Sequence, residues 1–455
     1  MRVLLLSTYD LGRQPFGLAS AAAALQAAGA ETTCIDLSRD TLSADAAAQA
    51  DVIAFFLPMH TATRLALPVI DRVRTINPHA TLCAYGLYAP LNAATLRERG
   101  VTEIIGGEYE DDLAALAHVA RSTSHVSHVA RRTSHVARVP VPRVEFRIPL
   151  RESLPALDRY ASLQWGGERR IVGYTEASRG CKHRCRHCPI VPVYDGRFRI
   201  VPQDIVIEDA RRQIAMGARH ITFGDPDFFN GPRHALELVE RFGAEFPGIS
   251  YDVTIKVEHL LKHADCLPVL RDTGCAFVTS AVEAVDEDIL RRLDKGHTAA
   301  DFERAVSLCR TVDLVLTPTF VAFTPWTTIE GYCQLLETIA RLELIDHVAP
   351  IQLAIRLLIP EGSRLLELEE VRAIVSRFDP QSLTHQWVHP DAPVDRLQES
   401  VATIVGRRLN AARRDLFKEI WQLAHDAAGS PAALPVNLDL LPRAAVPYLN
   451  EPWYC

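Results

Sequence analysis

Three cysteines lie close together near the middle of the chain, at Cys181, Cys185 and Cys188. Their spacing is C-x3-C-x2-C, and a short apolar run at residues 171–174 precedes them. When the loop between them curls, three thiolates converge on one point, which suits a soft metal. Structural zinc normally takes four protein ligands, whereas an iron–sulfur cube held by three cysteines keeps one iron open. We therefore interpret the three residues as ligands of a [4Fe–4S] cluster. A zinc loop completed by a histidine is the alternative.

The segments that must position this loop alternate between strands and helices. After the cysteines, a helix is predicted at residues 204–216, where the apolar positions recur at helical spacing. Buried strands are predicted from apolar, β-branched runs at residues 219–223, 251–256, 274–279, 313–320 and 351–356. Polar and charged residues follow several of these runs, so the strand ends are where we expect the site.

The cysteine motif after a strand resembles the signature of the radical S-adenosylmethionine (SAM) enzymes. In that family the open iron binds the amino and carboxylate groups of SAM, and an electron from the cluster cleaves a carbon–sulfur bond to give a carbon radical. The resemblance implies a partial (β/α)6 barrel, and six βα units fit it. In barrels of this type the active site lies at the C-terminal ends of the strands.

Residues at three strand ends also match that family. Asp225 and Asp227 occupy the place of its Gly-Gly-Glu motif, where an acid accepts from the SAM amino group. Glu283 begins a stretch that resembles the segment after the fourth strand, and it would bind the ribose hydroxyls or the amine. Arg356, followed by a Pro/Gly turn, resembles the strand beside SAM. The order of these residues after the cysteines argues against the zinc alternative.

The N-terminal third has its own strand–helix alternation, which predicts a doubly wound, Rossmann-like parallel sheet. Ligands bind such sheets at the carboxyl ends of the strands. Two segments resemble the cobalamin-binding domain of B12-dependent radical SAM enzymes. One is residues 14–19, which contain Gly17, and the other is the pair Gly106 and Gly107 before a glutamate. The Asp-x-His-x-x-Gly motif that supplies a ligand to cobalt is absent. The resemblance therefore implies cobalamin bound without a protein ligand, or a domain that has lost it.

The predicted domains are a Rossmann-like domain at residues 1–116, a linker at 117–165, the radical SAM barrel at 166–364 and a helical region at 365–455. In the linker, residues 117–126 and 127–136 are near-copies in tandem. Two copies are too few for a solenoid. We interpret them as a duplicated surface linker and not as a histidine-rich metal site.

The sequence ends in Glu-Pro-Trp-Tyr-Cys, which places a thiol at Cys455. This ending resembles a radical SAM subfamily whose tails carry adjacent cysteine or selenocysteine residues followed by Ala-Glu-Pro. One hypothesis is that a selenocysteine codon after Cys455 was read as a stop. Cys455 would then be a reactive thiol that binds a thiophilic substrate, holds a metal or donates a hydrogen atom. A loose chain end is the alternative.

Composition limits the remaining possibilities. The chain has 455 residues and a net charge of −7, which gives no reason to expect a nucleic-acid partner. No apolar stretch reaches the length of a membrane span, so we expect a cytoplasmic enzyme. We predict a radical SAM enzyme that acts on a small molecule and takes electrons from flavodoxin or ferredoxin. It would transfer a methyl or aminocarboxypropyl group in natural-product or organoarsenical biosynthesis. A non-catalytic iron–sulfur or zinc sensor is the alternative.

Overall fold

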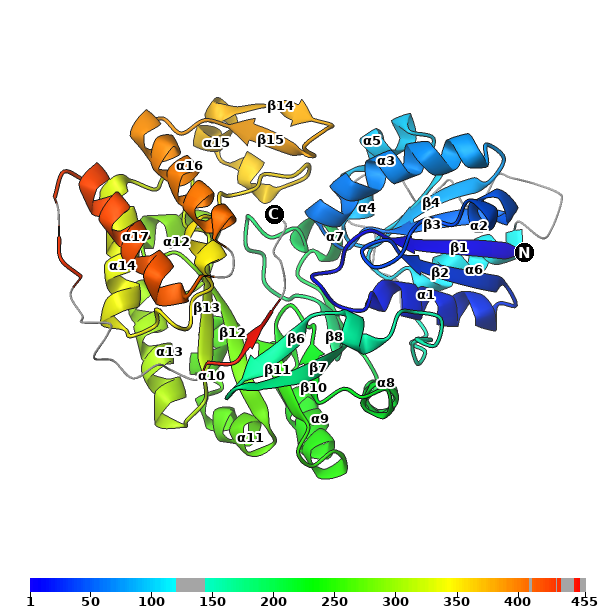
Figure 1. The fold of residues 1–455 in the computed structure, drawn as a ribbon, viewed down its shortest axis with the longest axis horizontal. Helices are drawn as coiled ribbons and strands as arrows, with labels where there is room; N and C mark the ends of the chain where they lie inside the picture. Colours follow the sequence, from blue (N-terminus) through cyan, green and yellow to red (C-terminus); the bar gives the residue numbers. More distant parts are fainter. Residues whose placement is uncertain (120–143, 409–410, 431, 435–445, 451–455) are drawn as a thin grey trace.

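The computed structural model describes residues 1–119, 144–408, 411–430, 432–434 and 446–450. The duplicated linker segment and Cys455 therefore lie mainly or wholly outside the described residues. A five-stranded sheet and a seven-stranded sheet organise the molecule, and they lie beside each other in Figure 1. Among the described helices, none is both long and apolar enough to cross a lipid bilayer.

The N-terminal sheet is parallel throughout, with the strand order β2-β1-β3-β4-β5. Its strands are β1 (Arg2–Ser7), β2 (Glu31–Asp36), β3 (Val52–Phe56), β4 (Thr81–Tyr85) and β5 (Glu103–Ile105). Alternate apolar residues of β1 enter two separate cores, one on each face of the sheet. Helices α1 (Phe16–Ala27) and α6 (Glu110–Val119) cover one face. Helices α2 (Ala44–Gln49), α3 (His60–Ile76), α4 (Tyr88–Leu91) and α5 (Ala93–Glu98) cover the other. The predicted doubly wound sheet is confirmed.

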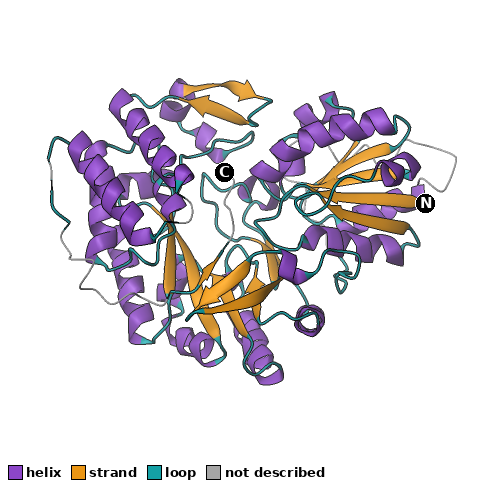
Figure 2. Ribbon diagram, in the orientation of Figure 1, coloured by secondary structure: helices purple, strands orange, loops and turns teal. Residues whose placement is uncertain are grey.

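The second sheet has the order β13-β12-β11-β10-β7-β6-β16. Its parallel strands are β7 (Glu168–Thr175), β10 (His220–Phe223), β11 (Ser250–Thr254), β12 (Cys275–Glu283) and β13 (Leu316–Phe320). The hairpin partner β6 (Ser162–Trp165) and the late strand β16 (Tyr448–Leu449) run antiparallel at one edge. Figure 2 shows this curved sheet with helices along its outer side. It is the predicted partial barrel.

The outer helices of the barrel pack their apolar faces onto the sheet in the largest core of the molecule. They are α8 (Gln203–Ala215), α9 (Pro232–Glu245), α10 (Val257–Lys262), α11 (Leu267–Asp272), α13 (Ala299–Thr311) and α14 (Ile329–Arg341). Helix α12 (Glu287–Leu293) packs in a separate core with Leu357, Ile359 and Leu365. Short 3-10 turns lie at η2 (Leu157–Arg159), η3 (Phe228–Asn230), η4 (Ala264–Cys266), η5 (Pro350–Leu353) and η6 (Arg364–Glu367). The central α8 prediction, residues 204–216, agrees to within one residue.

The sixth strand expected at residues 351–356 is wrong. Half of that segment, residues 351–353, lies in the 3-10 helix η5, and only Arg356 forms an isolated parallel bridge, to Phe323. The physical reason lies at the edge of β13. The backbone N–H of Phe320 donates to the side-chain oxygen of Gln352 at 3.0 Å, so a side chain takes the place of a strand partner there.

The C-terminal region is helical at α16 (Ala392–Arg407) and α17 (Arg413–Ala427), as predicted. The helical region expected at residues 365–455 is interrupted directly after α15 (Glu369–Ile374). From there the chain forms an antiparallel hairpin of β14 (Val375–Asp379) and β15 (Thr384–Trp387). The β-branched and aromatic residues of this stretch pair across the hairpin, and strand pairing outweighs the helical spacing of its apolar positions.

Candidate active site

The cysteine loop is closed at its base by a short antiparallel pair, β8 (Ser178–Gly180) with β9 (Phe198–Ile200). Gly180, directly before Cys181, has φ of 76°. A Cβ atom there would lie 2.4 Å from the Tyr194 ring and 2.5 Å from the carbonyl oxygen of Arg197. Only glycine allows this close approach, so the sequence places the first cysteine at a tight turn.

The far side of the loop is tied to the barrel through Arg186. Its backbone N–H donates to the carbonyl oxygen of Leu293 at 2.9 Å, and its guanidinium donates to the carbonyl oxygen of Arg292, also at 2.9 Å. These carbonyls lie at the C-terminus of α12, where helix carbonyls lack internal partners and attract cations. Helix α12 thus fixes the loop against the barrel mouth.

The three thiols are sheltered from water. Cys181 and Cys185 are buried, and Cys188 is half-buried. Burial raises the pKa of Cys181 to about 11 and that of Cys188 to about 12. Thiolates in such a place need a compensating positive charge, because a metal ligand must be deprotonated.

Two buried lysines supply positive charge next to the thiols. The ammonium group of Lys256, at the end of β11, lies 3.9 Å from the Cys185 sulfur. Lys295, only 3% exposed, acts electrostatically with Cys185 and Cys188. Burial lowers the pKa of Lys295, but the charge of Glu283 more than offsets this, so its pKa is raised overall. The donor set and these cations fit an anionic iron–sulfur cluster.

Glu283 lies at the end of β12, beside the cysteine loop. Its carboxylate is 3.2 Å from the Lys295 ammonium and 3.1 Å from Nε2 of His187. Burial raises the pKa of Glu283, but Lys295 and then His187 lower this pKa by a larger amount. The net shift is downward and keeps the carboxyl ionised. His187 immediately precedes the third cysteine, so this acid reaches the loop directly.

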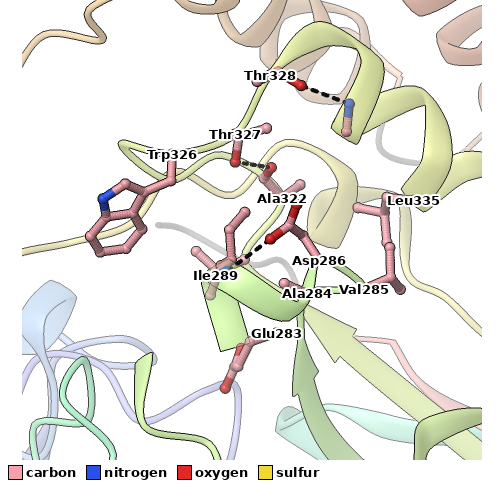
Figure 3. A pocket seen from close by; sticks show the side chains of 12 residues that line it. Glu283, Ala284, Val285, Asp286, Ile289, Ala322, Trp326, Thr327, Thr328 and Leu335 are labelled. Carbon is pink, nitrogen blue, oxygen red and sulfur yellow. Dashed lines mark hydrogen bonds between the residues drawn. The ribbon is translucent and has the colours of Figure 1, made fainter. Parts of the chain in front are cut away.

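Glu283 also lies at one end of a small pocket behind the strand, shown in Figure 3. Trp326 and Thr328 line the same pocket. In Figure 3 the carboxylate of Glu283 points away from Thr328. The pocket therefore accounts for the packing of the β12 turn, and the acid's polar contacts lie outside it.

The two aspartates after β10 have separate surroundings. Asp225 is 2% exposed, and its carboxylate accepts from the Ser178 hydroxyl at 2.5 Å and the Ala177 backbone N–H at 3.0 Å. Burial raises the pKa of Asp225 to about 7. Asp227 is 0% exposed and faces His183 and His259. Asp225 therefore braces the start of the cysteine loop.

Arg356 already has partners within the chain. It donates to the Asp395 carboxylate at 2.5 Å and to the carbonyl oxygen of Trp387 at 2.7 Å. Its guanidinium lies 3.6 Å from the centre of the Trp387 ring. These contacts join the end of the barrel to the C-terminal hairpin and α16.

At the N-terminal sheet the sequence-predicted glycines serve close packing. A Cβ on Gly17 would lie 2.2 Å from the Phe56 ring, and one on Gly106 would lie 2.1 Å from Pro90. Gly107 has φ of 67°. At the carboxyl end of β1, the hydroxyl of Ser7 is buried and has no hydrogen-bond partner among the described residues. That strand end is where a doubly wound sheet binds its ligand.

A cluster of charged side chains links the carboxyl end of the N-terminal sheet to the cysteine loop. The Arg179 guanidinium on β8 lies 3.0 Å from Glu108, 2.7 Å from Glu110 and 2.7 Å from Glu176. Glu108 also accepts from the Tyr194 hydroxyl at 3.1 Å. The acid after Gly106 and Gly107 thus contacts the loop that carries the cysteines.

Sequence reasoning missed Lys256, Lys295, His183 and His259 as site residues. Lys295 falls inside the stretch that begins at Glu283, and His183 lies between two cysteines, so both had a positional signal. Lys256 and His259 had none, because only the winding of β11 and α10 around the barrel brings them to the loop.

Residues 175–328 match the family described as the Radical SAM superfamily. The chain is 23% identical over 320 residues to the hopanoid C-3 methylase of Methylococcus capsulatus, covering 67% of this chain and 61% of the methylase. It is 27% identical over 155 residues to the ribosomal protein uS12 methylthiotransferase RimO of Porphyromonas gingivalis, covering 31% and 34%. The chain therefore spans less than two thirds of the length of these curated relatives.

Two solved structures share the fold over most of the chain. The cobalamin-dependent radical SAM enzyme OxsB with aqua-cobalamin bound has a TM-score of 0.71 at 14% identity, covering 94% of this chain and 71% of that one. The methyltransferase TsrM from Kitasatospora setae, with cobalamin and a [4Fe–4S] cluster, has a TM-score of 0.65 at 15% identity, covering 94% and 99%.

Proposed function

We propose that this chain, which carries a radical SAM domain over residues 175–328 and folds like cobalamin-dependent radical SAM enzymes, is a methyltransferase acting on a small molecule. The observation that carries the proposal is the sheltered cysteine loop with two buried lysines beside it. The activities of two similar proteins, the hopanoid C-3 methylase and the methyltransferase TsrM, favour methyl transfer over aminocarboxypropyl transfer.

Cys181, Cys185 and Cys188 would hold a [4Fe–4S] cluster, which when bound supplies the electron that cleaves a carbon–sulfur bond of SAM. Lys256 and Lys295 offset the negative charge gathered at the thiolates. Glu283, held ionised beside His187, is the acid best placed to accept from the hydroxyl or ammonium groups of SAM. Because the lysines and Glu283 are buried, their charges act in a medium where water screens them weakly.

The N-terminal sheet would hold cobalamin at the carboxyl ends of its strands, and cobalamin when bound supplies the carrier of the methyl group. The unpartnered hydroxyl of Ser7 at the end of β1 supports a ligand at this edge. The turn at Gly106 and Gly107 leads into Glu108, whose contacts with Arg179 and Tyr194 hold the edge against the cysteine loop. A flavodoxin or ferredoxin is the proposed electron donor.

The test is anaerobic reconstitution of the full chain with iron and sulfide, followed by SAM and dithionite. We expect about four irons per chain, as for one [4Fe–4S] cluster, and reductive cleavage of SAM. Cys185→Ala should abolish both, whereas Cys266→Ala, a half-buried cysteine outside the loop, should change neither. Release of 5′-deoxyadenosine supports radical chemistry, and methylthioadenosine would point to aminocarboxypropyl transfer. A protein that takes up zinc and no iron, or that leaves SAM intact, contradicts the proposal.

A further inference from the structure

A second group of metal-binding side chains lies next to the cysteine loop. His183 comes from the loop itself, Asp227 from the segment after β10, and His259 from α10. One ligand atom from each lies within 4.8 Å of the others. Three separate parts of the barrel thus direct two imidazoles and a carboxylate toward one place.

The spacing of these atoms suits a small metal ion. Nε2 of His183 is 3.5 Å from Oδ2 of Asp227 and 3.3 Å from Nε2 of His259. Ligands bound at about 2.0–2.2 Å around a tetrahedral ion lie roughly 3.3–3.5 Å apart. The His259 nitrogen nearer the carboxylate is Nδ1, at 2.6 Å, and a small shift of this ring away from Oδ2 would let Nδ1 serve as the single ligand atom of His259.

That short contact is an imidazole–carboxylate ion pair whose atoms lack the alignment of a regular hydrogen bond. Although Nδ1 of His259 and Oδ2 of Asp227 are neighbours, neither has a hydrogen-bond partner of acceptable geometry among the described residues. Their residues are 1% and 0% exposed, so bulk water does not satisfy them. Buried polar atoms without partners are rare in proteins and indicate a missing water or ion.

The remaining surroundings favour a cation. The other ring nitrogen of His183, Nδ1, lies 3.6 Å from the Glu258 carboxylate. A carboxylate behind a metal-bound imidazole fixes the ring and increases its basicity, and this arrangement accompanies many histidine-ligated metals.

We propose that His183, Asp227 and His259 bind a divalent transition metal ion, separate from the iron–sulfur cluster. Two imidazoles and one carboxylate suit zinc, cobalt or iron in the divalent state, and they leave at least one coordination position open. The ion ties the cysteine loop to β10 and α10. This role for Asp227 replaces the contact with SAM that its sequence position suggested, and leaves Glu283 as the acid for SAM.

The experiment measures metal content in the full chain, reconstituted anaerobically and then exposed to Zn²⁺ before gel filtration. We expect about one zinc per chain in addition to the cluster iron, since the site offers one set of ligands. Asp227→Asn, which keeps the shape of the side chain, and His259→Ala should each lose the zinc. His263→Ala is the matched control, because its ring lies 5.6 Å from that of His259 but outside the cluster.

Cobalt spectroscopy distinguishes this site from the cysteines. In the Cys185→Ser variant, which lacks one cluster ligand, added Co²⁺ should give the visible bands of a four- or five-coordinate nitrogen–oxygen site without a sulfur-to-cobalt charge-transfer band. Zinc that persists in His259→Ala, a strong sulfur band, or the absence of zinc from the wild-type chain would overturn the proposal. Iron content and SAM cleavage, measured on the same samples, report separately on the proposed methyltransferase.

Discussion

Glu283 combines an unusual backbone with a buried charge. Its φ is 71°, in the left-handed region that residues other than glycine seldom occupy, and the pairing register between β12 and β13 shifts just before it. Such a conformation costs about 1–3 kcal/mol and persists where its surroundings demand it. The demand here is electrostatic, because the turn places the carboxylate against Lys295 and His187.

Asp10 provides a pH-dependent prediction at the same scale. Burial, opposed by Arg13, raises the pKa of Asp10 from 3.8 to about 7. The folded chain therefore holds a proton between pH 3.8 and 7 that the unfolded chain releases, and stability falls as pH rises through that window. Asp10→Asn cannot ionise, so relative to wild type it should gain about 2–4 kcal/mol of unfolding free energy between about pH 4 and pH 8.

Urea titrations at both pH values measure this gain. Asp40→Asn is the control, since Asp40 is an exposed carboxylate paired with Arg159, and this variant should follow the pH profile of the wild type. Equal pH profiles for Asp10→Asn and wild type would contradict the prediction.

Residue types and spacing identified the three cysteines as candidate cluster ligands and the acids at the strand ends as candidate contacts of SAM. They were not enough to predict the partners of those residues. Arg356 was expected beside SAM, yet its strongest contacts are with Trp387 and Asp395, from a hairpin and helix whose positions follow from tertiary packing. A charge at a strand end identifies a place in the barrel, but its partner depends on chain segments far away in sequence.

At the scale of elements, the small pair β8–β9 controls the geometry of the cysteine loop. The alternation of strands and helices was predictable because each buried strand is a short apolar run. The sixth strand was not, because the Gln352 side chain satisfies the edge of β13 in place of a backbone. Short pairs such as β8–β9 also escape prediction, since three residues carry too little periodicity to recognise.

Gly180→Ala should disrupt the loop while leaving the barrel folded. A methyl group at residue 180 would overlap the Tyr194 ring and the Arg197 carbonyl, so the loop must shift. We expect a large loss of iron after reconstitution, measured together with far-UV circular dichroism.

Gly248→Ala separates backbone strain from crowding. Gly248 has φ of 85°, yet nothing lies within 4 Å of a Cβ there. This variant should lose about 1–2 kcal/mol of stability from the left-handed backbone and keep its iron. Equal iron contents in the two variants would show that the space around Gly180 is not limiting.

At the scale of the whole molecule, buried ion pairs hold the N-terminal sheet against the barrel. Arg179 joins Glu108 and Glu110 to β8, as described above. Arg151, 2% exposed, donates to Asp209 on α8 at 2.7 Å and to the side chain of Gln14 at 2.9 Å. Fork-shaped guanidinium groups can bind several acceptors at once, which lysine cannot do.

Arg179→Met should therefore destabilise the molecule strongly. It leaves two buried carboxylates, Glu108 and Glu110, and the half-buried Glu176 without their common partner. Removal of one member of a buried ion pair costs about 3–5 kcal/mol. We expect thermal unfolding to begin at lower temperature and to separate into two transitions, one for each sheet.

Arg211→Met on α8 is the control for loss of charge. Arg211 is 47% exposed and pairs with Glu208 and Glu245 at the surface. Exposed pairs contribute about 0–1 kcal/mol, so calorimetry should show a single, nearly unchanged transition. A similar small effect for Arg179→Met would mean that the cluster of charged side chains does not couple the sheets.

Strand β16 has a consequence for the order in which the chain folds. It pairs with β6, and Asn450 accepts a hydrogen bond from the Ser162 backbone across 288 positions of sequence. During synthesis, β6 emerges early and waits with one open edge until residue 450 leaves the ribosome. Contacts between distant residues form slowly, and an open strand edge invites pairing with other chains. The barrel's outer edge thus stays open until residue 450 has been made, and protection from other chains matters up to that point.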